Sequence, residues 1–137
     1  MISYHLDRKS IDYDRNIFPL GGTFDKVLKT VEKAHENSVV IRTNTVIGGF
    51  NLDVLDYIVD DIISYIRPKI VNFLPVNLFD ESEKNGMSGY IDYVRLRPTL
   101  KRNIDKLREK LPESLVFVRY MPFCDMEGYE QHIAGTL

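Results

Sequence analysis

Apolar residues recur along this chain with two spacings, and the two spacings alternate. In residues 23–37 an apolar side chain returns every three or four positions, which is the pattern of an amphipathic helix. Residues 38–46 are instead dense in β-branched side chains, which favours a strand, and Gly48 and Gly49 end it. The pattern therefore predicts a helix followed by a strand.

The same alternation runs from one end of the sequence to the other. Residues 2–6 form a short strand-like run before the first helix, and the polar residues 80–90 are predicted to form a long exposed loop. Pro68 and Pro112 stop helices, because proline has no N–H to continue them. The other predicted elements are a helix over 51–66, with Asn51 as its cap, a strand over 70–76, a helix over 98–111, a strand over 115–121 and the start of a helix at 129.

This order of elements predicts the fold class. Strands spaced roughly 30 to 45 residues apart, with a helix between each pair, indicate right-handed βαβ units and a parallel sheet. We expect an α/β protein of one domain, residues 1–137, with about four parallel strands in an arc of a (β/α) barrel and helices on its convex side. Because the sequence opens and closes within regular structure, we expect it to be a fragment of a larger barrel.

Polar side chains occupy strand positions that a parallel sheet normally fills with apolar ones. Both faces of such a sheet are covered, and an unpaired buried polar group costs about 1–3 kcal/mol. We therefore expect these side chains to line a cavity that faces a polar ligand, with His5, Asp7, Asn44 and Asn77 near the C-terminal ends of the strands. The alternative is that the arginines pair with local acids at a sheet edge. The candidates are Ser3, His5, Asp7, Arg42, Asn44, Asn72 and Arg119.

Composition narrows the class of protein. The net charge is −2, with 44% hydrophobic and 28% charged residues, so electrostatics favour neither nucleic acid nor a membrane surface as a partner. A single cysteine, Cys124, excludes an intrachain disulfide, and it is most simply a small apolar residue. His35 and His132 have no zinc-binding spacing, and we expect no metal site. With no leader or long apolar run, the expected location is the cytoplasm.

Three segments resemble the radical S-adenosylmethionine enzymes. Residues 4–28, from Tyr4-His5-Leu6-Asp7 through Gly21-Gly22-Thr23-Phe24, resemble the fourth strand and following helix of that fold. Residues 40–53, with Arg42-Thr43-Asn44 and Asn51-Leu52-Asp53, resemble its fifth strand and helix cap. Residues 118–130, with Arg119-Tyr120-Met121-Pro122-Phe123-Cys124, are similar to a late segment of some members. The resemblance spans nearly the whole chain.

The family signature C-x-x-x-C-x-x-C is missing, and one cysteine cannot supply the three thiolates that hold its 4Fe-4S cluster. The resemblance therefore implies the C-terminal part of a barrel whose parent protein binds the cluster and S-adenosylmethionine, with neither expected on this chain alone. It implies that Ser3 lies near the ribose, Arg42 faces the methionine carboxylate and Asn44 adds a polar contact. His5, Asp7, Asn72 and Arg119 remain the substrate-side candidates.

The resemblance also implies partners for this chain, and two alternative interpretations remain. The implied partners are the missing N-terminal half of the barrel and an unknown substrate, and an exposed sheet edge predicts self-association of the isolated chain. One rival is a complete, non-enzymatic binding module of doubly wound type, with helices on both faces of an open sheet. Another is a subunit derived from the barrel that no longer takes part in catalysis.

Overall fold

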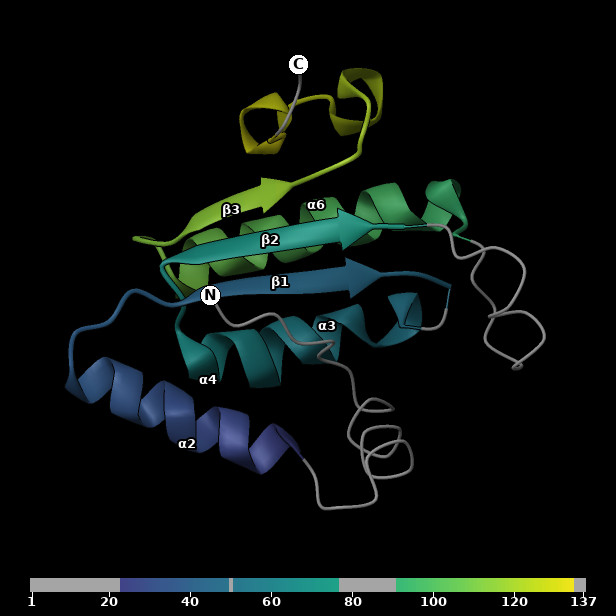
Figure 1. Cartoon of the computed structure of the whole chain (residues 1–137). Coiled ribbons are helices and arrows are strands. Elements are labelled where there is room, and N and C mark those ends of the chain that lie inside the picture. The colour runs from purple at the N-terminus through teal and green to yellow at the C-terminus, as the bar shows by residue number, and fades with distance from the viewer. Residues whose placement is uncertain (1–22, 50, 77–90, 135–137) are drawn as a thin grey trace.

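The computed structural model describes residues 23–49, 51–76 and 91–134. The predicted strand over 2–6 and the predicted loop over 80–90 lie outside these residues. Within them, the alternation of helix and strand that the sequence predicts is confirmed as an α/β fold with a parallel sheet (Figure 1).

The sheet has three strands in the described part of the chain, β1 (Arg42–Ile47), β2 (Ile70–Pro75) and β3 (Leu115–Val118). They lie parallel and side by side in chain order, so β2 is in the middle (Figure 1). The register pairs Asn44 with Asn72 and Asn72 with Phe117. Right-handed crossovers between consecutive parallel neighbours place both connecting helices on the same face of the sheet.

β1 begins four residues later than predicted because the preceding helix ends there. Helix α2 (Thr23–Glu36) is followed by Ser38 in the left-handed region, at φ 56°. This geometry lets the Val39 N–H donate to the Ala34 carbonyl at 2.8 Å, which satisfies an otherwise unpaired helix-end acceptor. The β-branched run of 38–41 therefore connects the helix to the strand.

The predicted helix over 51–66 forms as four consecutive helical pieces. They are a 3-10 turn η1 (Leu52–Val54), α3 (Leu55–Tyr57), a π-helical segment η2 (Ile58–Ile63) and α4 (Ser64–Ile66). The predicted apolar face is confirmed, since every residue of it is buried: Leu52, Leu55, Val59, Ile62, Ile63 and Ile66. Arg67 ends the helix at φ 49°, immediately before Pro68.

Helix α6 (Tyr93–Lys110) starts five residues before the predicted position at Pro98. Asp92 caps it by accepting a hydrogen bond from the Val94 N–H at 3.0 Å. Pro98 is accommodated inside the helix on its exposed side. Burial of Leu96 and Leu100 on either side of Pro98 extends the packed face into the first turn, and this burial outweighs the hydrogen bond that proline cannot make.

The chain after β3 also differs from the prediction. The strand ends at Val118 instead of 121, because Tyr120 turns the backbone at φ 62°. Two 3-10 turns follow, η3 (Phe123–Met126) and η4 (Glu130–His132), so the helix predicted from 129 is wrong within the described residues. Beyond η4, Ile133 forms a parallel bridge with Val118, beside β3.

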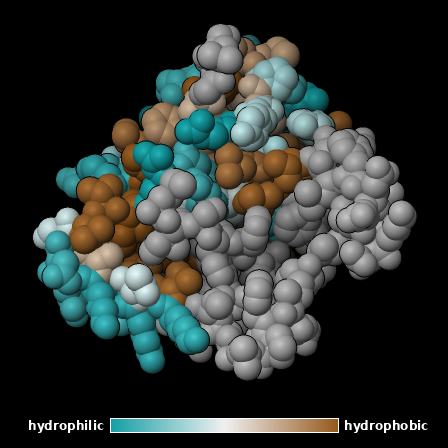
Figure 2. Space-filling view, in the orientation of Figure 1, coloured by the Kyte–Doolittle hydropathy of each residue, from teal (hydrophilic) through white to brown (hydrophobic). Residues whose placement is uncertain are grey.

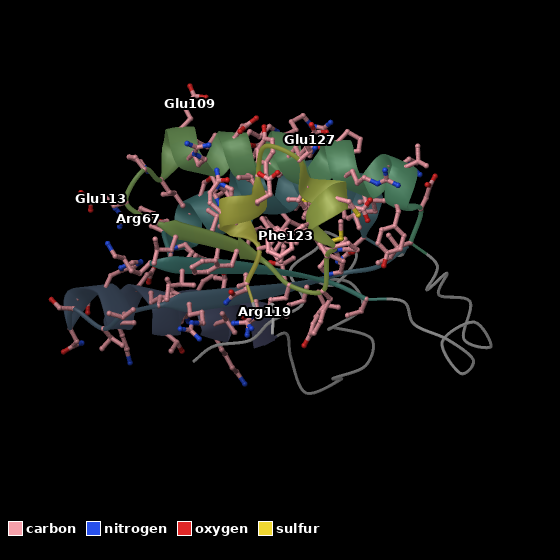
Figure 3. The ribbon with its side chains drawn as sticks, turned by 90° about the horizontal axis from the view of Figure 1, so that it is seen from above. Arg67, Glu109, Glu113, Arg119, Phe123 and Glu127 are labelled. Carbon is pink, nitrogen blue, oxygen red and sulfur yellow. The ribbon has the colours of Figure 1, made fainter. Side chains whose placement is uncertain are left out.

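The two helices that connect the strands lie on one side of the sheet and form what we call the helical layer. Seen from above, α6 and the helix of residues 52–66 lie on the same side of the three strands (Figure 3). Strand residues that face this layer are fully or almost fully buried: Thr43, Thr45, Ile47, Val71, Phe73, Val116 and Val118. None of the helices in the described ranges has the length and apolar character needed to cross a bilayer.

Candidate functional site

The described candidate residues all lie on the sheet face opposite the helical layer. Arg42 and Asn44 are two residues apart on β1, so their side chains leave the same face. Asn72 is the register partner of Asn44, and Arg119 lies two residues past Phe117, the partner of Asn72 on β3. The structure therefore brings Arg42, Asn44, Asn72 and Arg119 onto one surface, which we call the polar face.

The remaining candidates fall in another part of the chain. Ser3, His5 and Asp7 lie outside the described residues, as does Asn77. The polar face is turned toward the viewer in Figure 2, where hydrophilic and hydrophobic side chains are mixed. The site is accordingly built from the three described strands alone.

Two asparagines form the centre of the polar face. The Asn72 side-chain N–H donates to the Asn44 side-chain oxygen at 2.9 Å, across β1 and β2. Asn72 is only 2% exposed, and its own Oδ1 accepts no hydrogen bond from the part of the chain that the structure describes. An unpaired buried acceptor costs about 1–3 kcal/mol, so this oxygen is suited to a donor that the described residues do not provide.

The two arginines of the polar face are half-buried, and neither has a counter-ion among the side chains that the structure describes. Neither Arg42 nor Arg119 makes an ion pair or a side-chain hydrogen bond within the described residues. Three arginines of α6 do pair with acids: Arg97, for example, pairs with Asp125 at 3.3 Å. The alternative that local acids neutralise the two strand arginines thus finds no such acid among the side chains that the structure describes. Each guanidinium keeps its planar donor set available for an oxyanion.

The two arginines are far apart. Four residues along the strands and two strand spacings separate Arg42 from Arg119, which is roughly 16 Å between their Cα atoms. Arg42 opens β1, at the N-terminal end of the sheet, whereas Arg119 follows the C-terminal end of β3. The asparagine pair lies between them.

A buried asparagine closes the turn after β1 in a way that the sequence did not predict. The Gly48 N–H donates to Asn51 Oδ1 at 2.9 Å, and Asn51 Nδ2 donates to the Val46 carbonyl at 2.7 Å. Asn51 is therefore bonded back to the strand and makes no side-chain cap for the helix. Gly48 thus belongs to the turn that ends β1, and its carbonyl accepts from the Asn51 N–H at 3.2 Å. An asparagine three residues after a strand-ending glycine is the signal that was missed.

A shallow groove elsewhere contains none of the candidate residues. It runs between α2 and α4, where His35 Nε2 donates to the Ile66 carbonyl at 2.7 Å. The Tyr65 hydroxyl donates to Glu32 at 3.1 Å, and this hydrogen bond raises the pKa of Tyr65. These contacts hold α2 against the end of α4, so the groove is a helix–helix junction.

Metal-binding side chains are not gathered in the described ranges. Those ranges contain no group of three or more histidine, cysteine, aspartate and glutamate side chains placed to hold a metal ion. Cys124 is exposed in η3. His132 Nδ1 donates to the Val116 carbonyl at 2.9 Å, which ties η4 to β3.

Comparison with known proteins identified no relative of this chain. No family model matches the chain, and neither a curated protein nor a solved structure is significantly similar to it.

Proposed function

We propose that this chain is the C-terminal part of the barrel of a radical S-adenosylmethionine enzyme, that it supplies walls for the cofactor and the substrate, and that it is not catalytic alone. The observation that carries the proposal is the Asn72 side chain, which is buried on the polar face with an oxygen that has no hydrogen-bond partner among the described residues.

The strand topology supports an arc of a barrel. The described strands follow chain order, and the helices that connect them lie on one side of the sheet. A doubly wound sheet needs a reversal of strand order, which brings helices onto the second face. The strands that the structure describes contain no such reversal. In a partial barrel of about four strands, the polar face is the concave wall that meets ligand.

The residues present fit the polar end of S-adenosylmethionine. That end carries a carboxylate and an ammonium group. Arg42 has no counter-ion in the described ranges and offers bidentate donors to a carboxylate, and Asn72 Oδ1 offers an acceptor to an N–H donor. Asn44 holds the Asn72 amide in place through the 2.9 Å hydrogen bond. Ser3, proposed to lie near the ribose, is outside the described residues.

The residues present do not fit an iron–sulfur cluster. The chain has a single thiol, Cys124, and a cluster of this class needs three from one signature. We therefore assign no step of the reaction to the cluster here. The cluster belongs to the missing half of the barrel in this proposal, and radical chemistry by the isolated chain is not expected.

The decisive experiment uses the protein as its genome encodes it. We expect the reading frame upstream of Met1 to encode a C-x-x-x-C-x-x-C motif. The protein from that frame, reconstituted with iron and sulfide and then reduced, should release 5′-deoxyadenosine from S-adenosylmethionine. Arg42→Gln should raise the KM for S-adenosylmethionine about tenfold, the effect of losing one charge-assisted carboxylate contact. Arg67→Gln removes an exposed arginine at a helix end and should leave KM unchanged.

Two results would overturn the proposal. One is an upstream frame without the cysteine motif. The other is a reconstituted protein that binds the cluster yet releases no 5′-deoxyadenosine. Either result would favour one of the two alternatives, a non-enzymatic binding module or a barrel-derived subunit that no longer takes part in catalysis.

A further inference from the structure

We propose that Arg119 binds an oxyanionic group, a carboxylate or a phosphate, on the substrate of this protein. Its identity as a substrate group rests on the proposed function, whereas the oxyanion site itself is testable in this chain alone. Three observations support the assignment: the lack of an acidic partner for Arg119 among the described residues, the backbone of Tyr120 and the place of Arg119 at the C-terminal end of the sheet.

Burial distinguishes Arg119 and Arg42 from the two other arginines that have no acidic partner in the described residues. Arg67 and Arg108 are exposed, so water solvates their charge. Arg119 is half-buried, and it makes no ion pair within the described ranges. Its side chain extends from the sheet on the side away from α6 (Figure 3). A partly desolvated guanidinium is stabilised by an anion in the position that an aspartate or glutamate would otherwise take.

Arg119 also lies where parallel sheets bind their ligands. Its N–H donates to the Phe73 carbonyl at 2.9 Å, so it extends the ladder by one step beyond the C-terminal end of β3. Ligands of parallel α/β proteins bind outside this end of the strands. Arg42 lies at the opposite, N-terminal end of the sheet.

Tyr120, the residue after Arg119, has a backbone conformation that packing alone does not explain. Three non-glycine residues have positive φ in the described ranges: Ser38, Arg67 and Tyr120. Ser38 and Arg67 follow helices, where the left-handed conformation is the ordinary way to end. Tyr120 follows a strand, and its side chain is 74% exposed, so no burial of the ring compensates for the strain. Strain of this kind persists at ligand-binding positions.

The strained residue ends β3 and separates Arg119 from the loop that follows. At φ 62° the chain leaves the strand direction one residue after Arg119, and Pro122 then leads into η3. On the same face, Phe117 stands two residues before Arg119 and pairs in register with Asn72. Phe117 is therefore the neighbour of Arg119 on the same face of the strand, so a ligand bound at Arg119 has an aromatic side chain beside it.

The experiment titrates the full 137-residue chain with two probes, inorganic phosphate and acetate, at constant ionic strength. Chemical shifts of the arginine Nε–Hε groups and the backbone amides report binding. We expect a saturable shift centred on Arg119 with a Kd of about 1–10 mM, which is a typical strength for one charge-assisted contact. Chloride at the same ionic strength should leave these shifts unchanged. The preferred probe identifies the source: phosphate binding above acetate indicates a phosphate ester, and the reverse indicates a carboxylic acid.

Three variants make the test specific. Arg119→Gln should weaken probe binding at least about tenfold, and Arg119→Lys, which keeps the charge but loses the fork of donors, about threefold to fivefold. The matched control, Arg67→Gln, should bind as the parent does. Thermal unfolding checks that each variant is folded. If Arg119→Gln does not fold, the loss of probe binding in Arg119→Lys tests the proposal.

The inference fails if no saturable shift appears at Arg119, or if Arg67→Gln weakens binding as much as Arg119→Gln does, since the effect is then general electrostatics. These outcomes leave the release of 5′-deoxyadenosine by the full-length protein untouched. Conversely, a protein that binds oxyanions at Arg119 but releases no 5′-deoxyadenosine keeps this site and loses the proposed function.

Discussion

The Asn72 side chain donates a hydrogen bond of 2.9 Å to the side-chain oxygen of Asn44 on the neighbouring strand. The two residues are register partners in a parallel sheet, at positions where such sheets usually pair apolar side chains. The hydrogen bond satisfies the Asn72 amide N–H but leaves its Oδ1 without a donor in the described part of the chain. Folding therefore places a polar pair on the sheet at a cost in stability, as expected for a site that serves a ligand.

Replacing Asn72 should make the protein more stable. Asn72→Leu removes the unpaired oxygen, worth about 1–3 kcal/mol, and loses one hydrogen bond, worth about 0.5–1.5 kcal/mol, so the free energy of unfolding should rise by about 1 kcal/mol. Urea unfolding measures the change. The matched control is Asn51→Leu, because Asn51 is 1% exposed with both ends of its amide bonded. That variant should lose about 2 kcal/mol. Equal destabilisation by both substitutions would show that the Asn72 oxygen has a partner.

Acid should weaken the contact between the helix of 52–66 and α6. Asp56 accepts hydrogen bonds from Arg102 at 2.7 and 3.1 Å and from Lys106 at 2.9 Å. The hydrogen bond from Arg102 is the main cause that lowers the pKa of Asp56 from 3.8 to about 2, against the opposing effect of burial. Because the folded pKa lies below the unfolded one, the stabilisation is complete above about pH 4 and is lost as pH falls toward 2.

The size of this acid effect is modest, because the Asp56 side chain is 38% exposed. A shift of this size corresponds to roughly 2 kcal/mol, and solvent screening reduces it to about 1 kcal/mol. Urea unfolding of the parent and of Asp56→Asn should therefore differ by about 1 kcal/mol at pH 5 and converge near pH 2. Parallel pH profiles for the two proteins would contradict the assignment.

Lys106 bridges two carboxylates on the facing helix and should matter more than an isolated surface charge. Its Nζ lies 2.9 Å from both Asp56 and Asp60, and Lys110 adds a second contact to Asp60 at 2.9 Å. Hydrogen bonds from Lys110 and Lys106 lower the pKa of Asp60. Lys106→Met should lower the free energy of unfolding by about 1 kcal/mol, and less at 1 M salt. Arg108→Met, at an exposed position of the same helix, should change it by less than about 0.5 kcal/mol.

The backbone at Tyr120 can be tested through two substitutions with opposite effects. Glycine adopts positive φ freely, so Tyr120→Gly should raise the free energy of unfolding by about 0.5 kcal/mol after its greater unfolded-state entropy is counted. Valine is β-branched and tolerates this region poorly, so Tyr120→Val should lower it by about 1 kcal/mol. The exposed ring contributes little packing to either change. Thermal unfolding separates the two, and a loss of stability in both variants would mean that the tyrosine ring itself holds the turn.

Element boundaries depended on interactions that lie outside the local pattern. The proline at 98 predicted a helix start, yet burial of Leu96 and the Asp92 cap moved the start to Tyr93. A β-rich run predicted strand through 121, yet the positive φ of Tyr120 ended the strand at Val118. In each case packing or the path of the chain set the boundary of the element, against the local preference of the sequence.

The sequence by itself determined which residues share a face, because the backbone repeats of helix and strand depend only on local geometry. The buried stripe from Leu52 to Ile66 and the alternation of Arg42 and Asn44 with Thr43 and Thr45 follow from that periodicity. Only the tertiary structure decided that Asn44 meets Asn72 and that Arg42 and Arg119 stand apart without acidic partners in the described residues. Strand register is set by how the intervening helices pack on the sheet, and that packing joins residues far apart in the chain.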